Sequence, residues 1–383
     1  MSLPLDPRDE RPVARAALHA WLAFQLRAAL HPETARSQLA RAMGPVAALA
    51  AQTGETPEQV LGTRAFADVV AQLVRAGVRM VPFGSPAYPE RIAALADAAP
   101  LLGVRGDPAL LATPFVAIVG ARAPTRLGLD LARSLARELA AHGIGIVSGL
   151  ARGIDAAAHR GALEAGGVTV AILGCGPEQV YPAEHAQLAA EIAACGAVMS
   201  ELPVGAPPAK HHFPLRNRLI SALAHAVVVV EARARSGSLV TARHAANQGR
   251  DVLAVPGAVG APTSEGPNQL LRDGAWPVLD ASDVLAVLGF GPATPVERAN
   301  RASRERSEVR HRAASSAALQ RPLLDPATNA LLDAIHRDPA TRDELAERLG
   351  LSPQGLARQL LPLELEGVVA EDRDGRLRVL LER

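Results

Sequence analysis

Short apolar runs alternate with amphipathic segments through the middle of the chain. Six runs rich in aliphatic residues lie at 115–120, 143–149, 168–174, 197–201, 226–232 and 251–257. The segments between them, such as RLGLDLARSLARELAAHG, are rich in alanine and carry apolar residues at helical spacing. Near-continuous apolar strands that alternate with helices are typical of a parallel sheet covered on both faces. The pattern therefore predicts a doubly wound α/β sheet, which binds ligands at the carboxyl ends of its strands.

Different patterns flank this sheet. Residues 14 to about 80 have apolar positions at helical spacing, interrupted at Gly44-Pro45, and predict a small helical bundle. Residues 291–325 are rich in arginine and poor in large apolar residues, which is typical of a flexible basic linker. The C-terminal stretch predicts a winged helix, with helices at 328–337, 341–350 and 352–367 and a hairpin with an Asp-Gly turn. We therefore expect four parts: an N-terminal helical domain similar to SAM or helix-hairpin-helix domains (1–84), the sheet domain (85–290), the linker (291–325) and the winged helix (326–383).

The charge and cysteine content exclude several classes of protein. The formal net charge of +1 excludes a globally basic nucleic-acid coat, so an anion site has to be a local patch. Two cysteines argue against a disulfide framework and against a cysteine-rich metal site. The N-terminus lacks the apolar run of a signal peptide, and no stretch reaches about 18 apolar residues. We therefore expect a cytoplasmic protein without a membrane span.

Glycine, serine and arginine gather where the predicted strands end. Glycine and serine at helix starts leave backbone amides free, which suits phosphate. Glycines after strands often serve tight turns alone, but several basic or amide-rich turns at one edge of a sheet favour an anion site. The candidate residues are Gly120 and Arg122 at the end of the first strand, Ser148, Gly149 and Arg152 at the end of the second, and Ser236 and Gly237 after the fifth.

A second basic group surrounds the only lysine in the chain, Lys210. It lies with Phe213 in the loop after the fourth strand, and Arg216, Asn217 and Arg218 follow in the first turns of the next predicted helix. Cations with an interleaved aromatic ring are typical of sites for single-stranded nucleic acid, because the cations hold phosphates and the ring stacks on any base. Alternatively, the phenylalanine packs against the helix and the lysine is merely solvated.

The sequence lacks the usual nucleotide and metal motifs. Neither a P-loop nor a G-x-G-x-x-G fingerprint is present, so we expect no ATP or NAD cofactor. Asp155 and His159 lie four apart on a helix and Glu201 follows a strand, which allows a hydrolase to be imagined. We favour structural roles for these residues, because no nucleophile with an adjacent base stands out. His211 and His212 are adjacent and cannot easily share one metal ion.

Long motifs follow one another between about residues 85 and 290. They are GAR, SGLARGIDAAAH, GCGPEQVYP, SELPVG, FPLRNRLISALA, SGSLVTARHAANQGRDVLAVPG and NQLLRDGA. In this order they closely resemble the DNA-processing protein A family, DprA or Smf. The resemblance implies an extended Rossmann-like DNA-binding domain, with an N-terminal helical domain and a C-terminal winged helix in many members. It also implies a non-catalytic homodimer without nucleotide cofactor, which binds single-stranded DNA in natural transformation, protects it and loads the RecA recombinase onto it.

The resemblance also assigns roles to individual residues. The family's DNA pocket uses the arginine of a G-[ST]-R turn and the lysine and phenylalanine of K-x-x-F, which correspond to Arg122, Lys210 and Phe213 here. Ala121 stands where the family often has serine or threonine, which removes one hydroxyl and leaves the arginine. The resemblance places the dimer surface at about 240–275.

Two further questions stay open on the sequence alone. Nucleotide N-glycoside hydrolases that resemble the LOG enzymes use a similar fold, but their P-G-G-x-G-T motif with a following acid has no match in SGSLVTARHA or VPGAVGAP. A release assay for free base would separate the two functions. The predicted third helix of the winged helix, at 352–367, has one arginine against two glutamates, which favours a protein contact over reading DNA.

Overall fold

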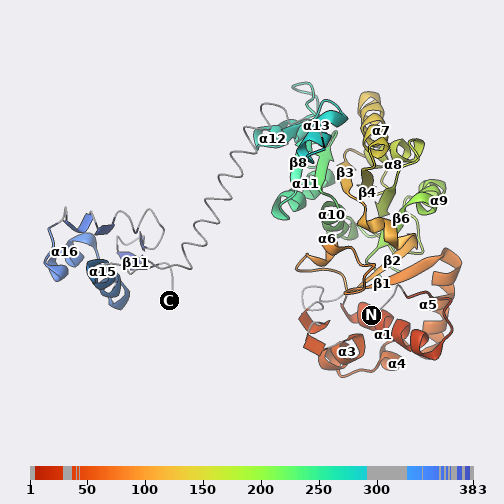
Figure 1. Ribbon diagram of the computed structural model, residues 1–383, viewed down its shortest axis with the longest axis horizontal. Coiled ribbons are helices and arrows are strands. Elements are labelled where there is room, and N and C mark those ends of the chain that lie inside the picture. Colours follow the sequence, from red (N-terminus) through yellow and green to blue (C-terminus); the bar gives the residue numbers. More distant parts are fainter. Residues whose placement is uncertain are drawn as a thin grey trace. The chain divides into compact units, whose positions relative to one another are not determined.

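The computed structural model describes residues 5–28, 37–39, 41–42, 44–290, 326–338, 340–352, 355–357, 359–360, 363, 369–372 and 376–379. The chain divides into two compact units, Met1–Glu297 and Arg298–Arg383 (Figure 1). The predicted linker, most of the predicted helix at 352–367 and the Asp-Gly turn lie outside the described residues.

The first unit is built on one sheet, which has nine strands within the described residues. The strands are β1 (Val78–Pro82), β2 (Leu101–Gly106), β3 (Phe115–Val119), β4 (Gly145–Ser148), β5 (Thr169–Ile172), β6 (Ala197–Ser200), β7 (Ala226–Val229), β8 (Asp251–Ala254) and β9 (Trp276–Pro277). They lie in the order β1-β2-β6-β5-β4-β3-β7-β8-β9. The strands from β6 through β3 to β9 pair in parallel, and the chain reverses its direction across the sheet between β3 and β7. This order confirms the predicted doubly wound sheet.

The sequence pattern does not predict β1 and β2. β1 pairs antiparallel with β2, and β2 pairs antiparallel with β6, so the prediction of helix up to about residue 80 is wrong from Val78 onwards. Met80 packs among the N-terminal helices, whereas Val81 packs in the core of the sheet. A short run that is apolar on both faces cannot be distinguished from a buried helix by its periodicity.

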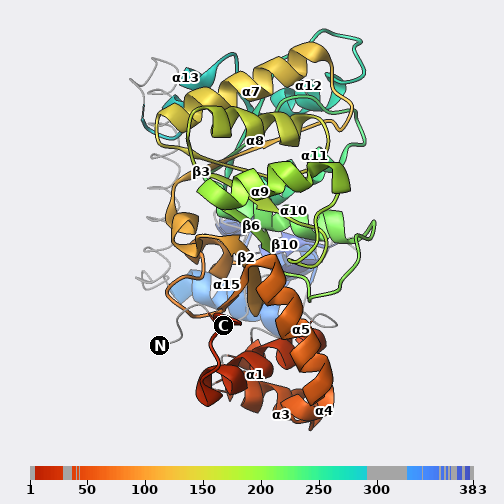
Figure 2. The same ribbon diagram turned by 90° about the vertical axis from the view of Figure 1, so that its right-hand side faces the viewer.

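Helices cover both faces of the sheet. In the first unit, the helices whose bounds lie within the described residues are α1 (Pro12–Ala28), α3 (Pro45–Thr53), α4 (Pro57–Val60), α5 (Thr63–Ala76), α6 (Glu90–Ala93), α7 (Arg126–Ala141), α8 (Ile154–Glu164), α9 (Ala186–Cys195), α10 (His212–Leu223), α11 (Gly237–Asn247), α12 (Glu265–Arg272) and α13 (Ala281–Val287). The 3-10 turns are η1 (Pro108–Ala112) and η2 (Ala183–His185). α7, α8, α9 and α13 cover one face, and α7, α8 and α9 lie side by side in Figure 2. α6, α10, α11 and α12 cover the other face.

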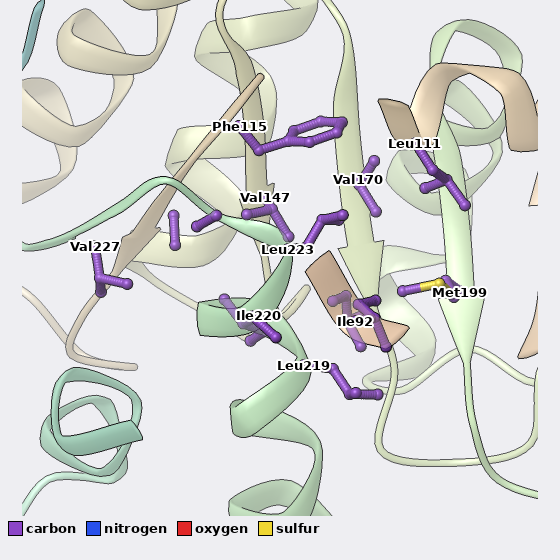
Figure 3. Packing of buried hydrophobic residues seen from close by; sticks show 14 of the residues in the cluster. Ile92, Leu111, Phe115, Val147, Val170, Met199, Leu219, Ile220, Leu223 and Val227 are labelled. Atoms are coloured by element: carbon purple, nitrogen blue, oxygen red, sulfur yellow. The ribbon is translucent and has the colours of Figure 1, made fainter. Parts of the chain in front are cut away.

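The core beneath α10 fixes the helix that follows the lone lysine (Figure 3). Burial of each large aliphatic side chain contributes about 1.5–3 kcal/mol. Phe115 closes this core, and its ring fits only because position 145 is glycine: a Cβ there would lie 2.4 Å from the ring. Other side chains of this core are at most 1% exposed, among them Ile92, Val147, Val170, Leu219, Ile220 and Leu223, and the most exposed member, Tyr88, is 6% exposed.

The N-terminal helices pack on the antiparallel end of the sheet. Their core includes Leu18, Phe24 and Leu73 together with Met80 of β1 and Leu101 of β2. Gln25 of α1 is 2% exposed, and its side-chain amide donates to the carbonyl oxygens of Leu101 at 3.3 Å and Glu201 at 2.9 Å. The helical bundle is therefore joined to the ends of two strands of the sheet.

The second unit has the elements of the predicted winged helix. It contains α15 (Pro326–Arg337), α16 (Arg342–Leu349) and an antiparallel pair, β10 (Val369–Glu371) and β11 (Leu377–Val379), around a separate apolar core. The described positions 355–357, 359–360 and 363 are helical. Thr341 and Glu344 form the predicted capping box at the start of α16. No helix within the described ranges of either unit is long and apolar enough to cross a lipid bilayer.

Candidate nucleic-acid interface

The loop after β3 carries Arg122 at the carboxyl edge of the sheet. Its backbone is held on both sides: the amide of Ile154 donates to the carbonyl oxygen of Ala121 at 3.2 Å, and Thr125 caps α7. Gly120 allows this close approach, because a Cβ there would lie 2.7 Å from the Ile154 side chain. Arg122 itself is exposed, so the loop presents a guanidinium from a fixed backbone.

A carboxylate of the chain occupies the start of α7. The Thr125 amide and hydroxyl donate to the two carboxylate oxygens of Glu231, at 2.8 and 2.5 Å. Glu231 lies two residues beyond the end of the neighbouring β7. A Cβ at Gly128 would lie 2.6 Å from that carboxylate. In doubly wound sheets the first helix after the switch point is where a dinucleotide places its phosphates. Here the internal carboxylate fills that position, which agrees with the missing nucleotide fingerprint.

An aromatic pair lies beside Arg122. The Arg122 guanidinium carbon lies 5.4 Å from the centre of the Phe213 ring, at the distance of a cation–π contact. The Phe213 ring also packs on Gly174, where a Cβ would approach it to 2.8 Å, so the turn after β5 has to be glycine. The Tyr181 ring lies 5.6 Å from the Phe213 ring, tilted by 41°. We call Arg122, Phe213 and Tyr181 the aromatic–cation cluster.

The aromatic–cation cluster joins residues that are distant in the sequence. Its members come from the loops after β3 and β5 and from the first turn of α10. Lys210 is exposed and lies two residues before α10, in the loop that leads to Phe213. The prediction from sequence included Arg122, Lys210 and Phe213 and missed Tyr181, whose only signal is an aromatic residue after a predicted strand.

Arg152 is exposed and paired with a carboxylate. Its Nε and Nη2 donate to the two carboxylate oxygens of Glu184 at 2.6 and 2.7 Å. Both side chains are more than half exposed, so solvent screens this pair strongly. Hydrogen bonding to Glu184 raises the pKa of Arg152 above its ordinary value.

Arg216 points into the interior and not to the surface. It is 5% exposed, and its Nη1 donates to the carbonyl oxygen of Gly149 at 2.8 Å and to that of Ile172. Glycine at position 149 leaves room for the guanidinium, because a Cβ there would lie 2.6 Å from it. Burial lowers the pKa of Arg216 to about 10, while Asp155 opposes that shift. Arg216 therefore anchors α10 to the ends of β4 and β5.

Arg218 and Asn217 are also committed to internal contacts. Arg218 is 5% exposed and bridges Glu201, with Nη2 to Oε2 at 2.6 Å, and Asp97, with Nε to Oδ2 at 2.9 Å. Asn217 is 9% exposed, and its side-chain amide donates to the carbonyl oxygen of Gly237 at 3.1 Å. Residues 216–218 therefore hold α10 in place, and their side chains are not available to a ligand on the surface.

The predicted glycine and serine residues divide into two kinds. Ser148 is buried, and its hydroxyl donates to the carbonyl oxygen of Ile118 at 2.7 Å. Ser236 caps α11 by accepting from the amide of Ser238, and Gly237 is exposed at the start of that helix. The start of α11 is therefore at the surface, whereas Ser148 joins β4 to β3.

The candidate catalytic residues are buried and internally bonded. Asp155 accepts from the amides of Gly149 and Ala151 at 3.1 and 3.3 Å, and burial raises its pKa. His159 is fully buried, its Nδ1 lies 2.7 Å from Oγ1 of Thr169, and burial lowers its pKa to about 3. Burial also raises the pKa of Glu201, which pairs with Arg218. None of the three faces solvent as an acid or base for an external substrate would. Among the described residues, no three His, Cys, Asp or Glu side chains are placed to hold a metal ion.

Comparisons with protein families match both units. The family model described as DNA recombination-mediator protein A matches residues 79–289, which is more than half of the chain. The model described as DprA winged helix domain matches residues 313–375. These matches agree with the resemblance that the sequence motifs carry.

Individual relatives agree with the family matches. Protein Smf of Escherichia coli (strain K12) is 39% identical over 305 residues, covering 78% of this chain and 77% of its own. A putative DNA processing protein DprA of Mycobacterium tuberculosis (strain H37Rv) is 38% identical over 391 residues and covers 96% of this chain and 95% of its own.

Two solved structures of DNA processing protein A are similar in fold. That of Streptococcus pneumoniae has a TM-score of 0.54 and 37% identity, covering 61% of this chain and 82% of its own. That of Helicobacter pylori, described for its unique single-stranded DNA binding mode, has a TM-score of 0.51 and 32% identity, covering 56% and 97%. The fold, the ordered motifs and these matches lead to one conclusion: the chain belongs to the DprA/Smf family of DNA processing proteins.

Proposed function

We propose that this chain binds single-stranded DNA at the carboxyl edge of its sheet, protects incoming DNA in natural transformation and loads the RecA recombinase onto it. The aromatic–cation cluster carries the proposal. It combines a guanidinium on a fixed loop, two rings and the nearby exposed Lys210 at one edge. Guanidinium and ammonium groups hold phosphates, and rings stack on bases without regard to their identity.

We assign separate roles in DNA binding to individual residues. Arg122 and Lys210 contact phosphates, Phe213 contributes an aromatic surface, and the exposed start of α11 at Gly237 offers a backbone amide to a further phosphate. Arg216, Asn217 and Arg218 act from beneath by holding α10, because their burial leaves them no route to the strand. Ser148 and Gly149 likewise shape the backbone beneath the edge.

Two other features of the sheet domain argue against a nucleotide-dependent enzyme. Glu231 fills the position at α7 where a dinucleotide phosphate would bind, and the candidate acids and bases are buried. We therefore assign the chain a non-catalytic role that needs no nucleotide cofactor. Release of free base from nucleoside monophosphates by the purified chain would revive the alternative of a LOG-like N-glycoside hydrolase.

We place a homodimer surface at residues 240–275. A groove of about 750 Å³ lies between α11 and α12, and apolar side chains including Leu239, Val252 and Leu270 line it. Val259, which also lines it, is 93% exposed. An exposed apolar patch of this kind fits a protein contact. A dimer that receives incoming DNA and passes it to RecA would work in the cytoplasm, where the recombinase acts.

Fluorescence anisotropy with a labelled oligothymidine and a duplex of equal length tests the DNA-binding proposal. We expect tighter binding of the single strand, with no requirement for ATP or magnesium. Lys210→Ala should weaken binding and lower the slope of log affinity against log salt by about 0.7, the value for one phosphate contact on a single strand. Equal affinity for duplex, or binding only with ATP, would refute the proposal.

A further inference from the structure

Tyr181 is unusual among the aromatic residues of this chain. The chain has ten, all within the described residues, and only Tyr181 and Phe290 are more than about a third exposed. Tyr181 is 46% exposed, and its ring lies against the Phe213 ring. Scattered exposed apolar residues are ordinary, but an exposed ring paired with a second ring beside an arginine is not scattered.

The backbone around Tyr181 is held firmly. Pro182, the next residue, is buried, and Val180, the previous one, packs against the cluster beneath α9. His185 in η2 is 7% exposed, and its Nδ1 lies 2.8 Å from the carbonyl oxygen of Leu150 in the loop after β4. An exposed ring on an anchored segment loses little freedom when a ligand stacks on it.

Phe213 offers less open surface than Tyr181. Arg122 lies over its ring at 5.4 Å, and the ring lies so close to Gly174 that a Cβ there would come within 2.8 Å of it. The two rings are tilted by 41° with centres 5.6 Å apart, so a base cannot be sandwiched between them. A base that meets this edge therefore has to lie on an outer ring face, and the more exposed one belongs to Tyr181.

Resting on the proposed function and extending it, we propose that Tyr181 is a base-stacking residue of the single-stranded DNA site, supported from beneath by Phe213. Two guanidinium groups lie near the ring pair: that of Arg122 lies over the Phe213 ring at 5.4 Å, and that of Arg152 lies within electrostatic range of Tyr181. We expect a strand along this edge to contact Arg122, the ring pair and Arg152. The ring contacts neighbouring bases, and the cations contact the phosphates that flank them.

The test separates stacking from a structural role by removing the base. Anisotropy is measured on an oligothymidine and on a strand of equal length that carries abasic sugars. We expect Tyr181→Ala to bind the oligothymidine about 5- to 140-fold more weakly, which is a stacking contribution of roughly 1–3 kcal/mol at 1.4 kcal/mol per factor of ten. On the abasic strand the variant should bind like the wild type, because no base is left to stack.

Three further variants complete the test. Tyr181→Phe keeps the ring and should bind like the wild type, whereas Tyr181→Leu keeps the bulk and should bind like Tyr181→Ala. Phe290→Ala removes the other exposed ring and should change nothing. Equal loss on both strands, or no loss on either, would overturn the assignment while leaving single-strand binding intact. If the wild type fails to bind the oligothymidine, the proposed function itself fails.

Discussion

Replacing Arg216 should damage the fold and not the DNA contacts. Arg216→Met keeps the length and bulk of the side chain, so the change removes the charge and the hydrogen bonds and leaves little cavity. The carbonyl oxygens of Gly149 and Ile172 lose their donor, and the buried carboxylate of Asp155 loses the cation that opposes its desolvation. Removing one partner from a buried charged arrangement costs about 3–5 kcal/mol.

That cost translates into a large change in melting temperature. At about 2–4 °C per kcal/mol for a domain of this size, Arg216→Met should melt roughly 6–20 °C below the wild type. The matched variant is Arg122→Ala, which removes an exposed guanidinium and should melt within about 2 °C of the wild type because surface changes rarely alter stability. Differential scanning fluorimetry measures both melting temperatures, and anisotropy below the transition measures both affinities.

The two substitutions should therefore have opposite effects on stability and on DNA affinity. We expect Arg216→Met to lose stability and keep most of its affinity while folded, and Arg122→Ala to lose affinity and keep its stability. If Arg216→Met melts like the wild type and fails to bind DNA, its guanidinium reaches the strand, and the buried role that we assign to it is wrong.

Three other predictions address single contacts at or near the site. Glu184→Gln releases Arg152 from its exposed ion pair, so affinity for oligothymidine and the salt slope should both rise, by about 0.7 for the slope, whereas unchanged binding would show that Arg152 lies off the strand. Glu231→Ala frees the loop that carries Arg122, so it should weaken DNA binding although it removes a negative charge. In an Arg122→Ala background the same substitution should have no further effect on affinity, and an additive loss in that double variant would refute a role through Arg122. The low pKa of His159 keeps its ring neutral in the folded protein, so the free energy of unfolding should fall as the pH decreases from about 6.5 towards 3, by about 2 kcal/mol at pH 5. Urea denaturation of His159→Gln should lack this pH-dependent loss of stability, and an identical pH dependence in the variant would contradict the prediction.

Hydropathy alone predicts the parallel part of the sheet well. Its strands are short, apolar on both faces and separated by amphipathic helices, and that repeating contrast is local in sequence. β1 and β2 escape the prediction because their pairing with each other and with β6 is antiparallel and depends on residues far along the chain. Nothing local distinguishes Val78–Pro82 from the end of a helical bundle.

The candidate site is predicted only in part, because some of its contacts also depend on residues that are distant in the sequence. Arg122 and Phe213 follow from the motifs, but Tyr181 becomes visible only when the loop after β5 meets α10. The sequence also cannot distinguish an arginine that faces solvent from one that is buried. Arg218 looks like a phosphate ligand until its partners, Asp97 and Glu201, are brought to it by the fold.

The central claim is that the carboxyl edge of the sheet binds single-stranded DNA through Arg122. The most direct test measures the affinity of the wild type and Arg122→Ala for an oligothymidine across a series of salt concentrations without ATP. Arg137→Ala serves as the control, because it removes an exposed arginine from the last turns of α7, away from the aromatic–cation cluster. We expect Arg122→Ala alone to bind more weakly, with a salt slope lower by about 0.7. Equal affinity and slope for all three proteins would contradict the claim.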